Sequence, residues 1–357
     1  MVLDVPTRPT AIERNFRMLK QDSVLALILA AGLFLNSCQS GKLDLPPQGS
    51  TREAITPSRP SCFPIATDEQ VPISFAADAK TLVLRSRSRV QFLNLETMKS
   101  EIALVSPKPI VAAALSPNGQ ILAWSLEDNS IQLIQSSNGK LLNTLKGHTD
   151  ITFKLRFSSN GGRLFSGSHD GSVRIWDSKG DLVQMIQTNG EVLGLGISAD
   201  GTRLATIPFD GPVELWDLSN YQKISTLGGT GGYDTSDAVF SPDGKYLAAD
   251  LATGLFLWKL SDGKSLWGDV KNSLAINFSP DGSFLTYADV ERNEIVLSTP
   301  DGTKILRTLE GMPGTVWELF FSPDSSRLAA ADGREIRIWG VEDGQLLYVG
   351  KSACAKN

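Results

Sequence analysis

The chain has 357 residues, of which 41% are hydrophobic, and its formal net charge is −5. This length and apolar content allow a sizeable core. A mildly acidic chain with no basic stripe is poorly suited to binding nucleic acid or to charge-driven binding of anionic lipid. Only three cysteines and two histidines are present, with no zinc spacing among them, so we expect no metal site and no cofactor.

The chain begins with a segment that has the pattern of an export signal. Residues 1–23 are polar and carry Arg14, Arg17 and Lys20. Twelve apolar residues follow at 24–35. A bilayer-spanning helix needs about 20 apolar residues, whereas the hydrophobic region of a signal peptide is shorter. We therefore predict a signal peptide, with Met18 as an alternative start.

The end of this segment resembles the bacterial lipobox. Leu35 stands three residues before Cys38, and the small Ser37 stands immediately before it. The resemblance implies that residues 1–37 are removed and that Cys38 becomes lipidated, leaving 30 basic and 36 acidic residues, a net charge of −6. Gln39 after the cysteine resembles sorting to the outer membrane, facing the periplasm. An uncleaved short anchor is the alternative.

A flexible tether is predicted to follow the lipid anchor. Residues 38–61 are rich in Pro, Ser, Gly and Gln, a composition typical of linkers without regular structure. A flexible coil of this length has a root-mean-square reach of roughly 25 Å. The folded part would then stay close to the membrane and still reorient.

A pattern that recurs seven times, at a period near 41 residues, predicts the fold of residues 62–357. Its apolar anchor positions are Phe75, Leu115, Phe157, Ile197, Phe240, Phe278 and Phe321. A fixed period of this length in an all-β pattern is typical of a β-propeller. We predict an all-β, seven-bladed β-propeller of four-stranded antiparallel blades. The blades lie near residues 71–109, 110–150, 151–190, 191–234, 235–272, 273–314 and 315–350.

Turn residues divide each repeat into four strands. In the third repeat, the pairs Asn160-Gly161 and Asp170-Gly171 suit hairpin turns because both residue types tolerate positive φ. Ser-Pro-Asp-Gly stands at 241–244 and 279–282. The seventh repeat has Ser325 in place of the glycine, so we expect a strained turn or a different turn type there.

The repeats resemble those of the WD-repeat propeller family. The resemblance rests on Gly147-His148, on the Ser-Pro-Asp-Gly turns and on strands that end in Trp, and it spans roughly residues 71–350. It implies a buried polar network in the third blade, formed by His148, Ser166, Asp170 and Trp176. The six repeats that lack the histidine are expected to keep their shape through apolar packing.

The serine, histidine and aspartate of this network have the composition of a hydrolase triad. We reject that interpretation because a propeller needs the network for its structure and has no strand-to-helix turn to present a nucleophile. The other histidine, His169, lies in a turn and is expected to be solvated. The inner strands at 71–75, 111–115 and 274–278 are mostly apolar. We therefore predict that the protein is not an enzyme.

Two cysteines stand at opposite ends of the sequence that forms the predicted ring. Cys62 precedes the first inner strand and Cys354 follows the last outer strand. Because these chain ends meet in a closed ring, we predict a Cys62–Cys354 disulfide, which the compartment reached after export would permit. Two free thiols are the alternative.

Loops at one face of the ring are the candidate partner-binding surface. In the family that the repeats resemble, partners dock on the loops that enter inner strands and on those that join the two middle strands. Aromatic residues and arginine are the usual interface anchors, which selects Arg87, Phe209, Tyr233 and Trp317. An ordinary turn or core role is the alternative for each.

The sequence as a whole predicts a non-catalytic scaffold that is anchored to a bacterial membrane and binds other envelope proteins. Two alternatives stay open. One is a propeller enzyme, such as a metal-dependent lactonase or hydrolase. The other is an envelope sensor that binds a ligand in the central channel, where Trp317 could line the mouth.

Overall fold

A computed structural model describes residues 61–64, 71–232, 237–270, 273–310, 312–332 and 334–351. All of these belong to one compact unit, Ser58–Asn357. The predicted signal peptide and Cys38 lie outside the described residues, as does most of the predicted tether. None of the described residues is in a helix, so no helix among them could cross a membrane.

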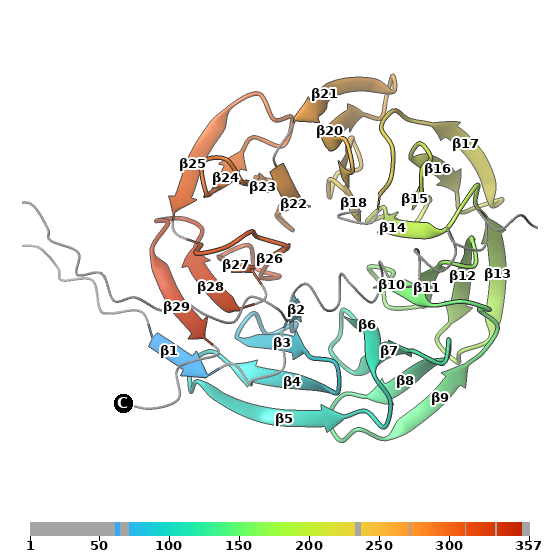
Figure 1. Ribbon diagram of the computed structural model, residues 1–357, viewed down its shortest axis with the longest axis horizontal. Coiled ribbons are helices and arrows are strands. Elements are labelled where there is room, and N and C mark those ends of the chain that lie inside the picture. Colours follow the sequence, from blue (N-terminus) through green and yellow to red (C-terminus); the bar gives the residue numbers. More distant parts are fainter. Residues whose placement is uncertain are drawn as a thin grey trace, which may run out of the picture. The chain divides into compact units, whose positions relative to one another are not determined.

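The described chain forms seven β-sheets, which Figure 1 shows arranged in a ring around a common centre. Every sheet has four strands that follow one another in sequence and pair antiparallel, and one of the seven sheets has a fifth strand that is described below. The all-β, seven-bladed propeller is therefore confirmed. The first strand of each blade lies innermost, and the fourth lies at the outer rim (Figure 1).

Blades 1 to 4 cover the first part of the ring. Blade 1 contains β2 (Val71–Phe75), β3 (Thr81–Arg85), β4 (Arg89–Asn94) and β5 (Lys99–Val105). Blade 2 contains β6 (Ile110–Leu115), β7 (Ile121–Leu126), β8 (Ile131–Gln135) and β9 (Leu141–Leu145). Blade 3 contains β10 (Thr152–Phe157), β11 (Arg163–Ser168), β12 (Ser172–Asp177) and β13 (Leu182–Gln187). Blade 4 contains β14 (Val192–Ile197), β15 (Arg203–Pro208), β16 (Glu214–Asp217) and β17 (Gln222–Thr226).

Blades 5 to 7 complete the ring. Blade 5 contains β18 (Asp237–Phe240), β19 (Tyr246–Leu251), β20 (Gly254–Lys259) and β21 (Lys264–Val270). Blade 6 contains β22 (Ser273–Phe278), β23 (Leu285–Asp289), β24 (Glu294–Ser298) and β25 (Ile305–Glu310). Blade 7 contains β26 (Glu318–Phe321), β27 (Arg327–Ala331), β28 (Glu335–Gly340) and β29 (Leu346–Lys351).

Burial follows the position of a strand within its blade. The second strands are almost fully buried, because neighbouring blades cover both of their faces. Every residue of the outer strand β17 is exposed. The apolar core therefore consists of clusters between adjacent blades, such as the one that joins Phe165 and Val173 of blade 3 to Leu204 and Trp216 of blade 4.

The turns between the first two strands of the blades share one hydrogen-bonding pattern. In blade 3, the Gly161 N–H donates to the Ser158 carbonyl at 2.8 Å, with Gly161 at a φ of 69°. In blade 7, the Ser325 N–H makes the same bond to the Ser322 carbonyl at 2.8 Å, with Ser325 at a φ of 59°. The blade 7 turn thus keeps its hydrogen bond and places a non-glycine residue in the left-handed region.

An additional strand closes the ring. β1 (Ser61–Pro64) pairs in parallel with β29, the outermost strand of blade 7, and Cys62 lies opposite Val349. The predicted tether boundary at residue 61 therefore overlaps this strand. The segment that precedes blade 1 is joined to blade 7 by backbone hydrogen bonds, a link that the sequence did not predict. No disulfide is present among the described residues, and Cys354, the predicted partner of Cys62, lies outside them.

Candidate functional site

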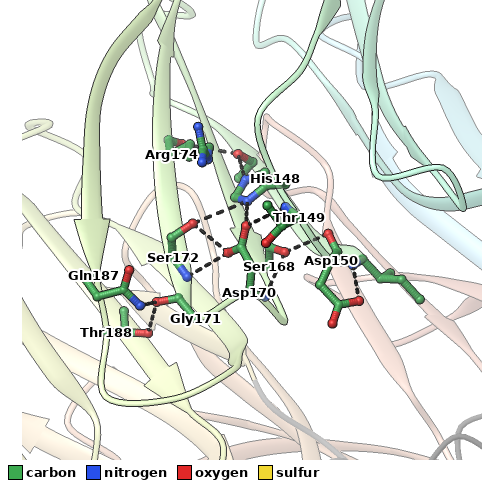
Figure 2. A network of polar contacts seen from close by, with 12 residues as sticks. His148, Thr149, Asp150, Ser168, Asp170, Gly171, Ser172, Arg174, Gln187 and Thr188 are labelled. Carbon is green, nitrogen blue, oxygen red and sulfur yellow. Dashed lines mark hydrogen bonds and ion pairs between the residues drawn. The ribbon is translucent and has the colours of Figure 1, made fainter.

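The polar network of blade 3 connects strands β11 and β12 to the segment that precedes β10 (Figure 2). His148 Nδ1 lies 2.8 Å from Asp170 Oδ2, and His148 Nε2 lies 2.8 Å from Ser166 Oγ. The Trp176 indole N–H donates to Ser166 Oγ at 2.9 Å. The structure thus brings all four residues of the predicted network together.

The hydrogen bonds assign a direction to this network. A carboxylate can only accept, so His148 carries its proton on Nδ1 and donates it to Asp170. In the neutral tautomer Nε2 is an acceptor, so the Ser166 hydroxyl donates to it while accepting from Trp176. Ser166 is fully buried, and both of its functions as donor and acceptor are used inside the blade. The arrangement therefore stabilises the blade and offers no hydroxyl to a substrate.

Asp170 is held in its charged form. Burial by itself raises the pKa of this carboxyl, but hydrogen bonds from His148, from Ser172 and from the Thr149 N–H outweigh burial and lower the pKa below its usual value. The carboxylate accepts bonds on both oxygens. The result is a charged anchor that ties the turn before β12 to the segment before β10.

Blade 4 contains a second polar network that uses no histidine. The Trp216 indole N–H donates to Thr206 Oγ1 at 3.0 Å, and that hydroxyl donates to Glu214 Oε2 at 3.2 Å. Glu214 is fully buried and forms an ion pair with Lys223 at 2.8 Å. The expectation that apolar packing alone shapes the blades without a histidine is therefore wrong for blade 4. Thr206 stands within the otherwise apolar segment 204–208 of β15, a signal that could have identified it, and the charged Glu214 begins β16.

Three of the four candidate partner-binding residues lie on one face of the ring. Antiparallel pairing places the turn of Arg87, the turn of Phe209 and the segment of Trp317 at the same end of the blades. Trp317 is 51% exposed, and Phe209 is half-buried. Arg87 forms an ion pair at 2.9 Å with Glu127 of the neighbouring blade. Tyr233 lies outside the described residues.

His169 also lies at this face. The sequence predicted a solvated side chain there, but the structure shows one that is mostly buried. Its side chain is 11% exposed. The imidazole stacks on Phe153 with 4.3 Å between the ring centroids, and Nδ1 lies 3.8 Å from Glu191 Oε2. The Phe153 ring, from an inner strand, therefore covers the histidine.

The inner strands enclose a cavity lined by charged side chains. Residues of β2, β3, β6, β10, β18 and β26 line a space of about 90 Å³. Its charged residues are Arg85, Lys154, Arg156, Asp237 and Glu318. The strands expected to be mostly apolar, 71–75, 111–115 and 274–278, supply none of these charges, which come from β3, β10, β18 and β26. The alternation of polar and apolar residues in β10 could have identified Lys154 and Arg156.

The charges in this cavity are only partly neutralised. Arg156 forms a short ion pair with Asp237, and Lys154 Nζ lies 3.9 Å from the same carboxylate. Burial raises the pKa of the Glu318 carboxyl, and the negative charge of Asp237 raises it further. The nearby cations offset only part of this rise. Burial also lowers the pKa of Arg85.

Among the residues that the structure describes, no group of three or more His, Cys, Asp or Glu side chains is arranged to hold a metal ion. The carboxylates at the turns bind neighbouring backbone and hydroxyl groups instead. Asp243, for example, accepts from the Ser241 hydroxyl at 2.7 Å and from the Lys245 N–H at 3.0 Å. These carboxylates fix turn geometry.

Two segments of the chain match a known repeat family. Residues 139–177 and 303–340 match the WD40 family, described as WD domain, G-beta repeat. The first segment includes the whole network of blade 3, and the second includes strands β25 to β28. The chain therefore contains WD40 repeats.

Similar proteins are known from eukaryotes. COMPASS component SWD3 of Saccharomyces cerevisiae is 33% identical over 102 residues, which are 28% of this chain and 32% of that protein. THO complex subunit 6 homolog of Danio rerio is 38% identical over 79 residues, 22% of this chain and 24% of that protein. Serine-threonine kinase receptor-associated protein of Gallus gallus is 27% identical over 106 residues, 30% of each chain. The matched region thus spans about a third or less of each of these relatives.

Proposed function

We propose that the protein is a non-catalytic platform that binds other proteins through the ring face bearing Arg87, Phe209 and Trp317. The exposure of Trp317 is the observation that carries this proposal. Five of the other six tryptophans end or lie within buried strands and are at most 7% exposed: Trp124, Trp176, Trp216, Trp258 and Trp339. A large aromatic side chain that stays in solvent at a loop-rich face is typical of an interface anchor.

The construction of the ring favours binding without rearrangement. Adjacent blades share apolar clusters, and arginine side chains donate to backbone carbonyls of the next blade. Arg203 reaches the Gly244 carbonyl at 2.8 Å, and Arg327 reaches the Ala79 carbonyl at 3.0 Å. A surface that is already ordered loses little conformational entropy when a partner docks. Two of the similar proteins are named as parts of complexes, which also supports a role in assembly.

We further propose that this platform is exported and held on a bacterial membrane by lipidated Cys38, with other envelope proteins as its partners and the periplasmic side of the outer membrane as its location. The proposal rests on the leader pattern that ends in Leu35-Asn36-Ser37-Cys38. Strand β1 begins at Ser61, so the chain between the anchor and the ring would be long enough to reach roughly 25 Å as a flexible coil. The Cys62–Cys354 disulfide stays a prediction for the exported protein.

In-cell crosslinking followed by affinity purification tests the binding face. We would compare the native chain with Trp317→Ala and with Ile224→Ala, whose side chain is equally exposed, at 52%, but lies on the outer strand β17. A partner recovered with the native chain and with Ile224→Ala, but lost with Trp317→Ala, is the expected result. Equal recovery with all three chains would refute this face as the binding site.

Metabolic labelling tests the anchor. Cells that produce the native chain or Cys38→Ala are grown with radioactive palmitate and then fractionated. The native chain is expected in the membrane fraction with label, and Cys38→Ala without label. Label-free native protein would refute the anchor and leave the partner-binding proposal standing.

A further inference from the structure

The cavity between the inner strands differs from the surrounding apolar core because it is lined by charged side chains that can donate hydrogen bonds. Its walls include the small side chains of Ala112 and Ala113, which leave room beside the charged groups. Phe153 and Phe320 also line it. These apolar side chains lower the local dielectric constant beside the charges, which strengthens the attraction between opposite charges. A charged group that entered this space would therefore bind more tightly than it would on the open surface.

Two cations in the cavity have unused hydrogen-bonding capacity. A guanidinium has five N–H donors, and within the described part of the chain Arg85 makes one long hydrogen bond, 3.4 Å from Nη1 to the Ile110 carbonyl. Lys154 Nζ lies 3.9 Å from Asp237, too far for a hydrogen bond. Arg156 is different, because its guanidinium is bound closely to the Asp237 carboxylate.

The balance of charge favours an anion. Arg85, Lys154 and Arg156 supply three positive charges, against the carboxyl groups of Asp237 and Glu318. Glu318 forms no ion pair with any described residue. Burial favours its neutral form, which can donate a hydrogen bond instead of repelling an anion.

We propose that this cavity is a binding site for a single carboxylate group, held by the Arg85 guanidinium and the Lys154 ammonium. The planar guanidinium matches the two oxygens of a carboxylate. The volume of about 90 Å³ is far below the roughly 300–1,000 Å³ of a drug-sized ligand site, so only a small group fits. Phe153 and Phe320 face the apolar part of the ligand. This site goes beyond the platform function, since it needs no docked partner.

Titration with sodium acetate at constant ionic strength, balanced with chloride, tests the site by calorimetry or NMR. The native protein is expected to bind acetate saturably. Lys154→Met and Arg85→Met are each expected to weaken binding at least tenfold. Lys108→Met is the control, because Lys108 lies at the same end of the blades and pairs with Asp128 outside the cavity. Glu318→Gln keeps a hydrogen-bond donor and is expected to retain binding.

Two sources of the carboxylate are distinguished by a peptide. The first probe is acetyl-Ala-Ala-Glu-Ala-Ala-amide, compared with the same peptide carrying Gln in place of Glu. If the Glu peptide binds at least tenfold more tightly than acetate and the Gln peptide does not bind, the site takes an acidic side chain of a partner. This source rests on the proposed function. Acetate binding equal to or tighter than peptide binding would indicate a small free anion.

Three outcomes would overturn the site itself. One is the absence of saturable acetate and peptide binding to the native protein. Another is undiminished binding to Lys154→Met, which keeps the hydrogen bond from Arg85 to the Ile110 carbonyl and is expected to fold. The third is inorganic phosphate binding tenfold more tightly than either carboxylate probe.

Discussion

Replacing Ser166 by alanine tests whether the blade 3 network stabilises the ring. The substitution removes the hydroxyl that accepts from Trp176 Nε1 at 2.9 Å and contacts His148 Nε2 at 2.8 Å. His148 and Trp176 are 7% and 3% exposed, so water cannot replace the lost partner freely. The two buried groups left unpaired, on His148 and Trp176, each cost about 1–3 kcal/mol, so we expect Ser166→Ala to lower the free energy of unfolding by about 2–6 kcal/mol.

Urea unfolding followed by far-UV circular dichroism measures this loss. Ser178→Ala is the control, because Ser178 is an exposed turn residue of the same blade. The midpoint of the first transition should fall for Ser166→Ala and stay constant for Ser178→Ala, with an unchanged slope in both. A loss below about 0.5 kcal/mol, typical of a surface substitution, would refute a stabilising role for the network.

Three further predictions concern individual blades and pH. Ala79 has a φ of 55°, which is a strained value for a residue other than glycine. Ala79→Gly should therefore stabilise the fold by about 0.5–1 kcal/mol in thermal melts. Ala77→Gly, in the same turn without positive φ, should not stabilise it, and equal effects would contradict the role of strain at Ala79. Lys223→Met leaves the buried Glu214 carboxylate without its ion pair and should cost about 2 kcal/mol at pH 7, against no change for the exposed Lys179→Met. The pKa of Asp170 is lowered in the folded state, and hydrogen bonds that outweigh burial lower the pKa of Asp243 to about 2. Both carboxylates therefore contribute stability above about pH 4, and this stability is lost as pH falls toward 2. A urea midpoint that stays constant from pH 7 to pH 3 would argue against this.

The sequence by itself determined the fold class, because the determinants of a blade are local. The period near 41 residues and the apolar alternation define strands of the right length and number. Residue pairs such as Asn160-Gly161 fix turns through the φ values that each residue tolerates. The network of His148, Ser166, Asp170 and Trp176 lies within one repeat and could be predicted from the resemblance for the same reason.

Only the tertiary structure decided what depends on several blades at once. Arg85 comes from blade 1, Lys154 from blade 3 and Glu318 from blade 7, and each looks like an ordinary charge in its own strand. Closing the ring brings them to one cavity, where loss of water changes their electrostatics. The parallel pairing of β1 with β29 likewise joins segments that are far apart in the sequence, at the beginning and the end of the described chain. Such contacts depend on the closure of the ring, which no local pattern of residues records.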